Sequence, residues 1–519
     1  MLFNTDVFIF LFLPGTLVGF FLLGRLGNER ASLLWLVAAS LFYYGWWNPI
    51  YLLLVGGSMA VNYTLGQYIS GAREAEAAKR ARHILIGGIV FNLGLLAYFK
   101  YANFFLDSIG HLTGSTLSVG EVLLPIGISF FTFQQIAYLV DTAKGDVGRY
   151  DFVEYSLFVL FFPQLIAGPI VHHKEMLPQF ATAHTYRPDL RNLSVGGSIF
   201  AIGLFKKVVL ADNLAMVATP VFASAEGGAT LDFFAAWQGT FCYGLQLYFD
   251  FSGYSDMAIG AARMFGIRLP INFNSPYQAT GIIDFWRRWH LTLSRFLRDY
   301  LYIALGGSRR GKTRRYVNLM ATMVLGGLWH GAGWNFLLWG FLHGLFLVLN
   351  HLWRALWGRP SENPLLRTLA RLFTLLVVTL AWVPFRAQTM DGALAVYRGM
   401  INLPAEWATV GPLALLQSLG FSFAGPAVSQ ANLESLVWLV GWLIVLWQAP
   451  NTQQLMARYE PAYEFDEEKM AEDPVPPLLR GRWPLFWRPG LGWALAIGVM
   501  FALALLNLNR VSEFLYYQF

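Results

Sequence analysis

The sequence is poor in charge and has almost no cysteine. Only 13% of its 519 residues are Asp, Glu, Lys or Arg, whereas soluble domains are usually about one quarter charged. A single cysteine, Cys242, excludes an internal disulfide and a cysteine metal cluster. No internal repeat is visible, so an inverted-repeat transporter gains no support. The first apolar run follows Asp6 rather than a basic segment, so we do not expect a cleavable signal peptide.

Apolar sequence is what the chain has in abundance. Hydrophobic residues make up 56% of it and aromatic residues 16%, with a mean hydropathy of +0.47. About 20 apolar residues cross a bilayer, and such runs recur along the whole chain. The sequence therefore predicts an all-α polytopic membrane protein, with no separate soluble domain in residues 1–519. The candidate spans are 7–24, 31–47, 50–70, 83–101, 121–140, 151–170, 194–216, 232–262, 317–350, 366–385, 434–449 and 490–508.

Two of these spans, 232–262 and 317–350, are too long for one simple crossing. Each is expected to be a helix pair or a broken helix.

The placement of Lys and Arg in short loops predicts the orientation. Loops 25–30, 71–82 and 141–150 contain them, and the alternate connections 48–49 and 102–120 contain none. This alternation places the N-terminus outside the cytoplasm. Segment 404–433 also lacks both residues and is placed outside. Segment 451–489 mixes the two signs of charge and is expected to be a cytoplasmic loop, with the C-terminus outside; its charges include Asp466, Glu467, Glu468, Arg480, Arg482 and Arg488.

A basic stretch lies between Gly281 and Arg315. "IIDFWRRWHLTLSRFLRDYLY" contains no proline or glycine, and its aromatic and leucine residues recur at helical spacing, so we expect an amphipathic interfacial helix with Asp284 as N-cap. Five of the seven residues 309–315 are basic, which predicts a cytoplasmic loop. It is either an anchor for anionic lipid or a site for a phosphate-bearing ligand such as acetyl-CoA. The basic residues are Arg309, Arg310, Lys312, Arg314 and Arg315.

His330 lies in the apolar stretch "LGGLWHGAGWNF". It follows Arg315 by 15 residues, which is about 22 Å on a helix, so it lies deep in a bilayer core roughly 30 Å thick. It is either hydrogen-bonded between packed helices or functional. Neighbouring glycines, which permit close backbone approach or an opened turn, and the basic loop favour function. His343 can join the same site only if the segment folds back, and no acidic ligand spacing supports a metal.

Two further polar groups accompany this histidine. His290, with Ser294 one turn later, is the second candidate, although a histidine beside Trp and Arg is often an interface anchor. Asp250 and Asp256 interrupt an apolar run that also holds Tyr254. Intramembrane carboxylates usually face a cavity or a partner. These two could pair with nearby arginines, line an acceptor tunnel, or serve a proton-coupled transporter.

Three blocks, "YFDFSGYSDMAIG" (248–260), "FWRRWHLTLSRFLRDYLYIALGG" (285–307) and "LGGLWHG" (325–331), resemble the membrane-bound O-acyltransferases, and most of all their bacterial alginate O-acetyltransferase subfamily. Cellulose- and peptidoglycan-acetylating relatives share these blocks, and D-alanyl transferases of teichoic acid are less similar. The resemblance implies a ring-like bundle of roughly 11–13 transmembrane helices with interfacial or re-entrant helices around a tunnel. It places the catalytic core in 194–350 and the family's catalytic histidine at His330, with His290 at the second position.

The resemblance also implies a bacterial inner-membrane enzyme. It would move an acetyl group from a cytoplasmic thioester, acetyl-CoA in the simplest case, to an exported polysaccharide, with a periplasmic esterase-like partner. We expect no permanently bound cofactor, no metal and no nucleic-acid partner, and membrane lipids as neighbours. The basic residues of 309–315 would meet the donor phosphates. The substrate tunnel would be lined by Asp250, Tyr254, Asp256, Ser294 and Trp329.

We expect His330 to act as general base on an acceptor hydroxyl, and His290 to orient the acceptor or stabilise the oxyanion. An acetyl-histidine intermediate is a rival route. Two other functions remain open at this point: a transporter or flippase of a small solute or lipid-linked sugar, and a scaffold for a secretion complex.

Overall fold

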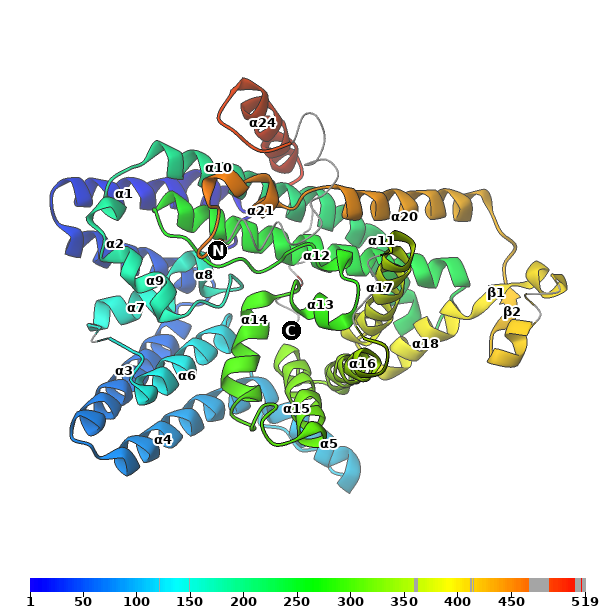
Figure 1. Cartoon of the computed structure of the whole chain (residues 1–519), viewed down its shortest axis with the longest axis horizontal. Helices are drawn as coiled ribbons and strands as arrows, with labels where there is room; N and C mark the ends of the chain where they lie inside the picture. Colours follow the sequence, from blue (N-terminus) through cyan, green and yellow to red (C-terminus); the bar gives the residue numbers. More distant parts are fainter. Residues whose placement is uncertain are drawn as a thin grey trace.

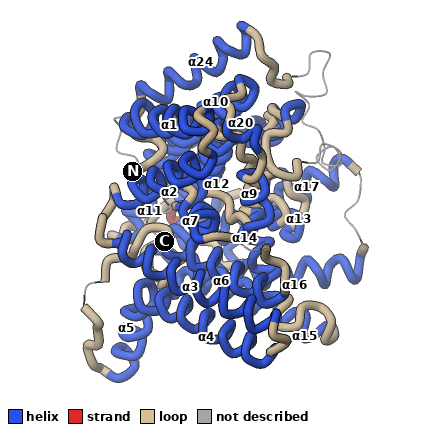
Figure 2. The backbone as a smooth tube through the Cα atoms, turned by 90° about the vertical axis from the view of Figure 1, so that its left-hand side faces the viewer, coloured by secondary structure: helices blue, strands red, loops and turns tan. Residues whose placement is uncertain are grey.

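The computed structural model of the chain is almost entirely α-helical (Figures 1 and 2). It describes every residue except 121, 149, 359–362, 411, 412, 414, 466–484, 509–514 and 516–519. Several charges that the loop assignments use therefore lie outside the described residues: Arg149, Asp466, Glu467, Glu468, Arg480 and Arg482.

The N-terminal part forms a group of packed helices, coloured blue to cyan in Figure 1. Pairs such as α1·α2, α3·α4 and α4·α6 lie against one another. The expected span 151–170 is not one helix, because the chain breaks at Phe161 between α7 and α8. The elements are η1 (Val7–Phe12), α1 (Leu13–Arg25), α2 (Glu29–Gly45), α3 (Tyr51–Glu74), α4 (Ala78–Leu96), η2 (Ala97–Tyr101), α5 (Ala102–Thr113), α6 (Ile128–Lys144), α7 (Phe152–Leu160), α8 (Phe162–Leu165), α9 (His173–Phe180) and η3 (Ala183–Tyr186).

The centre of the molecule is the long helix α12 (Phe233–Met264), packed against α10 (Leu190–Phe205), η4 (Lys206–Ala211) and α11 (Asp212–Glu226). Glycines allow the backbones of α12 and α10 to touch: a Cβ on Gly260 of α12 would lie 2.6 Å from the carbonyl oxygen of Gly196 on α10. Small residues permit such close backbone approach between membrane helices. The expectation of a pair or a break in 232–262 is therefore wrong, because α12 is one continuous helix of 32 residues.

The segment 317–350 does form a helix pair. It comprises most of α15 (Lys312–His330) and the first part of α16 (Trp334–Trp357), which pack against each other. The chain reverses over three residues, Gly331 to Gly333. Around this hairpin lie η5 (Pro276–Gln278), α13 (Ile282–Trp286), α14 (Leu291–Phe296), η6 (Leu297–Tyr302), α17 (Pro364–Arg386) and α18 (Met390–Met400).

The amphipathic segment after Gly281 is not one helix. It divides into α13, α14 and the π-turn η6, with a break at His290, whose φ of 44° is left-handed. Asp284 is not the N-cap, a position that Gly281 occupies; its carboxylate instead accepts a hydrogen bond from the backbone of Thr280. The segment is also not confined to an outer surface, because Trp289 is 3% exposed and His290 is fully buried.

The remaining elements lie at the periphery. Strands β1 (Asn402–Pro404) and β2 (Ser422–Gly425) form a short parallel pair at the right of Figure 1. Helix α24 (Leu491–Leu506) lies at the top of the same view. The others are η7 (Ala405–Thr409), η8 (Leu415–Leu419), α20 (Gln430–Gln448), α21 (Thr452–Leu455) and η9 (Ala457–Tyr459).

Six helices in the described part of the chain are long and apolar enough to cross a membrane, and α24 is a shorter apolar helix. With the helical content, this confirms an all-α polytopic membrane protein. The total number of spans and their orientation stay predictions. The six helices are Val7–Arg25, Ala78–Thr113, Leu190–Glu226, Trp334–Trp357, Pro364–Arg386 and Gln430–Gln448.

Candidate active site

His330 is the last residue of α15, at the inner end of the helical hairpin. The glycines around it serve mainly close approach. A Cβ on Gly327 would lie 2.2 Å from the carbonyl oxygen of Phe336, and one on Gly340 would lie 2.4 Å from that of Met323. Since real Cβ atoms do not come so close, both positions require glycine for α16 to return along α15.

The ring of His330 lies in an aromatic cage. Its centroid is 4.9 Å from that of Trp329, 5.0 Å from Trp339 and 5.3 Å from Phe385. The residue is 7% exposed. Among the residues that the structure describes, neither ring nitrogen has a hydrogen-bond partner. A neutral imidazole in this setting keeps a basic nitrogen available to a substrate.

Lys100 and Tyr101 hold the end of α15. The ammonium of Lys100 donates hydrogen bonds to the carbonyl oxygens of Trp329 (2.6 Å) and His330 (3.1 Å). The hydroxyl of Tyr101 donates to that of Leu328 (2.9 Å). The last carbonyls of a helix lack partners within the helix, so these two side chains cap it. Sequence reasoning missed Lys100, although a lysine in the candidate span 83–101 was a signal, because such residues are costly in a membrane.

The ring of His290 is hydrogen-bonded to Asn272. The ring Nδ1 lies 3.0 Å from Oδ1 of Asn272, and Nδ2 of that amide donates to Ser255 Oγ at 3.1 Å. Because Oδ1 only accepts, Nδ1 of His290 carries the proton, and Nε2 carries the lone pair. The ring of Trp329 neighbours both histidines, at 6.4 Å from His290 and 4.9 Å from His330. Asn272 is a second residue that sequence reasoning missed.

The hairpin also brings His343 to this site. Its ring lies 4.8 Å from Trp339, the residue that packs on His330, and its Nδ1 accepts a hydrogen bond from Trp286 Nε1 at 3.3 Å. The segment 317–350 therefore folds back, as a site shared by His330 and His343 requires. The described residues nevertheless contain no group of three or more His, Cys, Asp or Glu side chains placed to hold a metal ion.

The two carboxylates of α12 are paired with adjacent lysines rather than with Arg287 or Arg298. Asp256 contacts Lys206 Nζ at 2.8 Å, and Asp250 contacts Lys207 Nζ at 2.6 Å. Both pairs form because the π-turn η4 presents consecutive lysines to α12. A proton-coupled transporter would use these carboxylates, and this pairing does not favour that function.

Asp256 lines a small polar pocket that reaches Asn272, the partner of His290. Two other predicted tunnel residues do not line this pocket: Tyr254 stacks on Phe3 at 4.6 Å, and Ser294 Oγ donates to the carbonyl oxygen of Trp289 at 3.4 Å. The pocket is lined by Lys206, Tyr248, Ser252, Ser255, Asp256, Ile259, Asn272, Phe273, Asn451, Thr452 and Gln453.

The basic loop is mostly a surface feature. Arg309, Arg310, Lys312 and Arg314 are exposed, and only Arg315 is half-buried. The guanidinium of Arg315 lies 3.0 Å from Nδ1 of His351 on α16.

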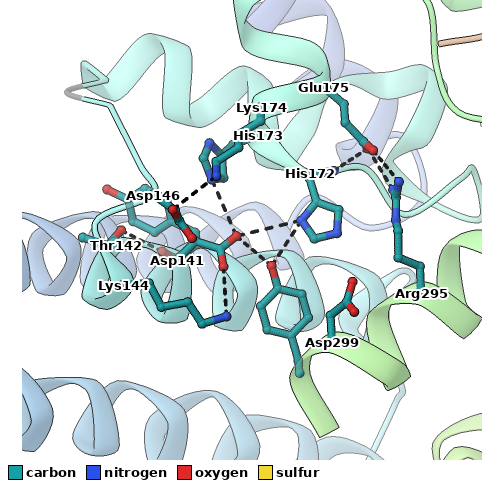
Figure 3. A network of polar contacts seen from close by, with 12 residues as sticks. Asp141, Thr142, Lys144, Asp146, His172, His173, Lys174, Glu175, Arg295 and Asp299 are labelled. Atoms are coloured by element: carbon teal, nitrogen blue, oxygen red, sulfur yellow. Dashed lines mark hydrogen bonds and ion pairs between the residues drawn. The ribbon is translucent and has the colours of Figure 1, made fainter. Parts of the chain in front are cut away.

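A second polar centre lies where α6, α9 and η6 meet (Figure 3). Asp141 Oδ2 accepts a hydrogen bond from Tyr300 (2.7 Å) and lies 3.6 Å from His173 Nε2 and 3.9 Å from His172 Nδ1. Burial favours the neutral carboxyl, but contacts with the two histidines and Tyr300 outweigh it, so the pKa of Asp141 lies below its ordinary value. His173 is thus an internal residue rather than an interfacial one, with 1% exposure.

A column of aromatic rings joins the two centres. Tyr300 packs on Phe296 at 4.8 Å, Phe296 stacks on Phe133 at 4.2 Å, and Phe133 stacks on Trp329 at 5.2 Å. Trp329 then contacts His330. The predicted tunnel residue Trp329 is therefore part of the wall beside both histidines.

Comparison with known proteins identifies the family of the chain. Residues 89–368 match the model of the membrane-bound O-acyltransferase family. A peptidoglycan O-acetyltransferase of Helicobacter pylori is 46% identical over 429 residues, which cover 78% of this chain and 80% of the relative. A Pseudomonas aeruginosa protein named "Probable alginate O-acetylase AlgI" is 42% identical over 407 residues, covering 78% and 75%.

A teichoic acid D-alanyltransferase of Streptococcus thermophilus is less similar, at 30% identity over 236 residues, which cover 44% of this chain and 57% of the relative. The matched family segment contains both histidines, the basic loop and the α15–α16 hairpin. The chain is thus a multi-pass membrane enzyme that transfers acyl groups to oxygen, and it belongs to the membrane-bound O-acyltransferase family.

Proposed function

We propose that this enzyme transfers an acetyl group from a cytoplasmic thioester, acetyl-CoA in the simplest case, to a hydroxyl of an exported polysaccharide. The observation that carries the proposal is the state of His330. Its ring is enclosed by aromatic side chains, and its nitrogens have no hydrogen-bond partner among the described residues. A purely structural histidine in a membrane bundle would be hydrogen-bonded.

The reaction follows from a neutral His330. Its basic nitrogen takes the proton of the acceptor hydroxyl while the oxygen attacks the thioester carbonyl carbon. The new C–O bond forms, the C–S bond breaks, and the departing thiolate takes the proton back from His330. The aromatic cage keeps water from competing for the acetyl group. The cap on α15 from Lys100 keeps the ring in place.

The tautomer of His290 favours one of its two expected roles. With Nδ1 protonated against Asn272, Nε2 carries the lone pair and is an acceptor rather than a donor. It can then orient an acceptor hydroxyl, whereas stabilising an oxyanion requires a donor. We therefore assign His290 to acceptor positioning.

An acetyl-histidine route would use the same residues. Incubating the purified enzyme with radiolabelled acetyl-CoA and no acceptor distinguishes the two. Direct attack predicts no label on the protein. Label that is retained by the wild type and lost in His330→Ala would establish the covalent route.

The proposed location is the bacterial inner membrane, with the N-terminus periplasmic and loop 309–315 in the cytoplasm. This orientation rests on the loop charges. It places the exposed arginines of that loop where a donor's phosphates arrive. We propose that these residues steer the donor towards the membrane.

The acceptor is proposed to be a glycan. Two relatives are named for peptidoglycan and alginate, and their identities to this chain, 46% and 42%, are too similar to select one. The hydroxyl that attacks can belong to the glycan or to a periplasmic esterase-like partner that completes the transfer. Labelled acetate on a co-purifying protein would indicate the partner route.

The decisive experiment is replacement of His330 by Ala in cells, followed by measurement of glycan-bound acetate at matched protein levels. We expect acetate to fall to the background of a deletion strain. His111→Ala, at the exposed end of α5, is the matched control and should change nothing. Normal acetylation in His330→Ala would overturn the assignment.

A further inference from the structure

Acyl transfer to oxygen needs hydrogen-bond donors as well as a base. When the acceptor oxygen attacks, negative charge develops on the carbonyl oxygen of the acyl group, and fixed donors stabilise this oxyanion. His290 does not supply such a donor, because its Nε2 carries the lone pair. The reacting carbon sits about 3 Å from the attacking oxygen, with the donors close by. The donors therefore belong to residues that surround His330, the proposed base.

Trp339 provides one buried donor beside His330. The two rings are nearly perpendicular, at 84°, with centroids 5.0 Å apart, and Trp339 is 1% exposed. Its Nε1 is buried and has no acceptor in the part of the chain that the structure describes. An indole N–H can only donate, and burying it without an acceptor is costly. The indole N–H of Trp237, by contrast, donates to the carbonyl oxygen of Met400 at 3.1 Å.

His343 provides a second donor, and its hydrogen bond to Trp286 identifies which nitrogen carries the proton. Nδ1 of His343 accepts from Trp286 Nε1 at 3.3 Å. Since an indole N–H only donates, this Nδ1 has no proton, and the ring carries its proton on Nε2. That Nε2 is buried and has no partner among the described residues. His343 thus has the opposite tautomer to His290, with a donor at Nε2 instead of an acceptor.

The two donors lie together on α16. Positions 339 and 343 are one helical turn apart, so their side chains share a face of the helix, and their ring centroids are 4.8 Å apart. The α15–α16 hairpin brings Trp339 against His330. Nε1 of Trp329 is also buried without a partner in the described chain. Its ring, however, neighbours His290 as well as His330, which places it beside the acceptor hydroxyl.

We propose that Nε1–H of Trp339 and Nε2–H of His343 form the oxyanion hole of this enzyme. As the C–O bond forms, the carbonyl π electrons move to the carbonyl oxygen, which accepts a hydrogen bond from each group. As the oxyanion collapses, the C–S bond breaks and the thiolate takes the proton that His330 removed, while both donors keep theirs. The inference rests on the proposed role of His330, and it assigns an acceptor to two buried N–H groups.

Replacing only the indole N–H of Trp339 tests the first donor. Trp339→benzothienylalanine keeps the size of the ring and has sulfur in place of the N–H. The measurements are the initial rate of labelled acetate incorporation into glycan, in cells at matched protein levels, and the unfolding midpoint of the purified full-length protein. We expect the rate to fall about 10²- to 10³-fold, as for the loss of one oxyanion donor. The midpoint should stay or rise, because a buried donor without a partner is removed.

Two matched replacements by the same analogue are the controls. Trp237→benzothienylalanine removes the hydrogen bond to Met400, so it should lower the midpoint while the rate per protein is unchanged. Trp329→benzothienylalanine should leave the rate unchanged, because we do not assign its N–H to the oxyanion.

His343→Asn and His343→Gln test the second donor, and they do so even if the position-339 analogue fails to fold. The Asn oxygen can replace Nδ1 as acceptor for Trp286 but leaves no donor at the position of Nε2, whereas the Gln amide places an N–H there. We expect Asn to lose about 10²-fold or more in rate and Gln to retain more. A role limited to the Trp286 hydrogen bond predicts the reverse order.

A wild-type rate in Trp339→benzothienylalanine, a loss in Trp329→benzothienylalanine alone, or a rate in His343→Asn that equals or exceeds that in His343→Gln would overturn this inference. Normal acetylation in His330→Ala would instead overturn the proposed base. The two failures are therefore distinguishable.

Discussion

The histidines at the two polar centres of this enzyme differ in their polar contacts. At the end of α15, His330 is surrounded by aromatic rings, and its nitrogens have no hydrogen-bond partner in the described part of the chain. Where α6 and α9 meet, His172 and His173 contact Asp141, and His172 also meets the Tyr300 hydroxyl at 3.1 Å. Burial does not separate them, since His173 is 1% and His330 is 7% exposed.

The difference lies in what each ring can still do. A histidine whose neighbours are carboxylate and hydroxyl groups is fixed in orientation, and it stabilises the fold. A histidine in an apolar cage gains little stability from polar contacts but keeps a nitrogen for chemistry. The proposal for His330 therefore rests on its lack of polar partners among the described residues, rather than on its burial.

The largest expected effect follows from replacing His330 by Gln in the purified enzyme. Loss of a general base should lower kcat by about 10²- to 10⁴-fold. The unfolding midpoint should hardly change, because no hydrogen bond to the ring is lost among the described residues. Steady-state kinetics and thermal unfolding measure the two effects. A stable variant with kcat within tenfold of the wild type would contradict the assignment.

Asp141→Asn should give the reverse pattern. Removing the charge from this buried network should lower the free energy of unfolding by about 3 kcal/mol, while the activity of the folded fraction persists. Asp299→Asn is the matched control: it pairs with the exposed Arg298, and such pairs contribute about 1 kcal/mol at most.

The same network predicts a pH dependence. Folding lowers the pKa of Asp141, so its ionised form stabilises the protein above its unfolded-state pKa of about 3.9. This stability is lost as the pH falls below that value. Thermal unfolding should therefore be measured from about pH 3 to about pH 7, a range that includes this value. The unfolding midpoint should fall more steeply towards acid pH in the wild type than in Asp141→Asn. Parallel profiles would show that Asp141 does not stabilise the fold.

A smaller effect is expected from Asn272→Ala, which frees His290 to change tautomer and orientation. Misplacing an acceptor-positioning group should lower kcat by about 10- to 100-fold. Asn272→Asp keeps an acceptor for Nδ1 and should retain more activity, whereas a purely structural role predicts no such rescue. Asn103→Ala, near the surface, is the control.

The smallest effect should come from Arg309→Gln/Arg310→Gln. Exposed charges contribute a few tenths of a kcal/mol each, so KM for the donor should rise by about threefold with kcat unchanged. The difference should vanish at high salt, because salt screens exposed charges. A KM that is unchanged even at low ionic strength would remove the steering role.

The family and the main helices could be predicted from the sequence because long apolar runs and distinctive blocks such as "LGGLWHG" are local features. The helix break at His290 could not, because "IIDFWRRWHLTLSRFLRDYLY" contains no residue that ends a helix. At the break, His290 has a left-handed backbone, which is unfavourable by itself, and its ring is hydrogen-bonded to Asn272. Such a backbone is kept only where tertiary contacts offset its cost.

The interaction partners of the polar residues within the apolar segments could not be predicted from the sequence either. Lys100 and Trp329 are 229 positions apart in sequence, yet the lysine caps that carbonyl. Asp256 pairs with Lys206 across two packed helices, where sequence reasoning offered arginines of the following segment. Charge pairing between distant segments depends on which helix faces touch, and hydropathy patterns do not encode this.

The sequence by itself determined that this chain is a membrane O-acyltransferase, and it singled out the histidine at 330, because apolar run lengths and family blocks are properties of consecutive residues. Only the tertiary structure decided which histidine rings have hydrogen bonds or ion pairs, and that the ring of His330 has none among the described residues. That distinction depends on contacts such as those of Asp141 with His173 and of His330 with Trp339 and Phe385, which join segments far apart in the chain.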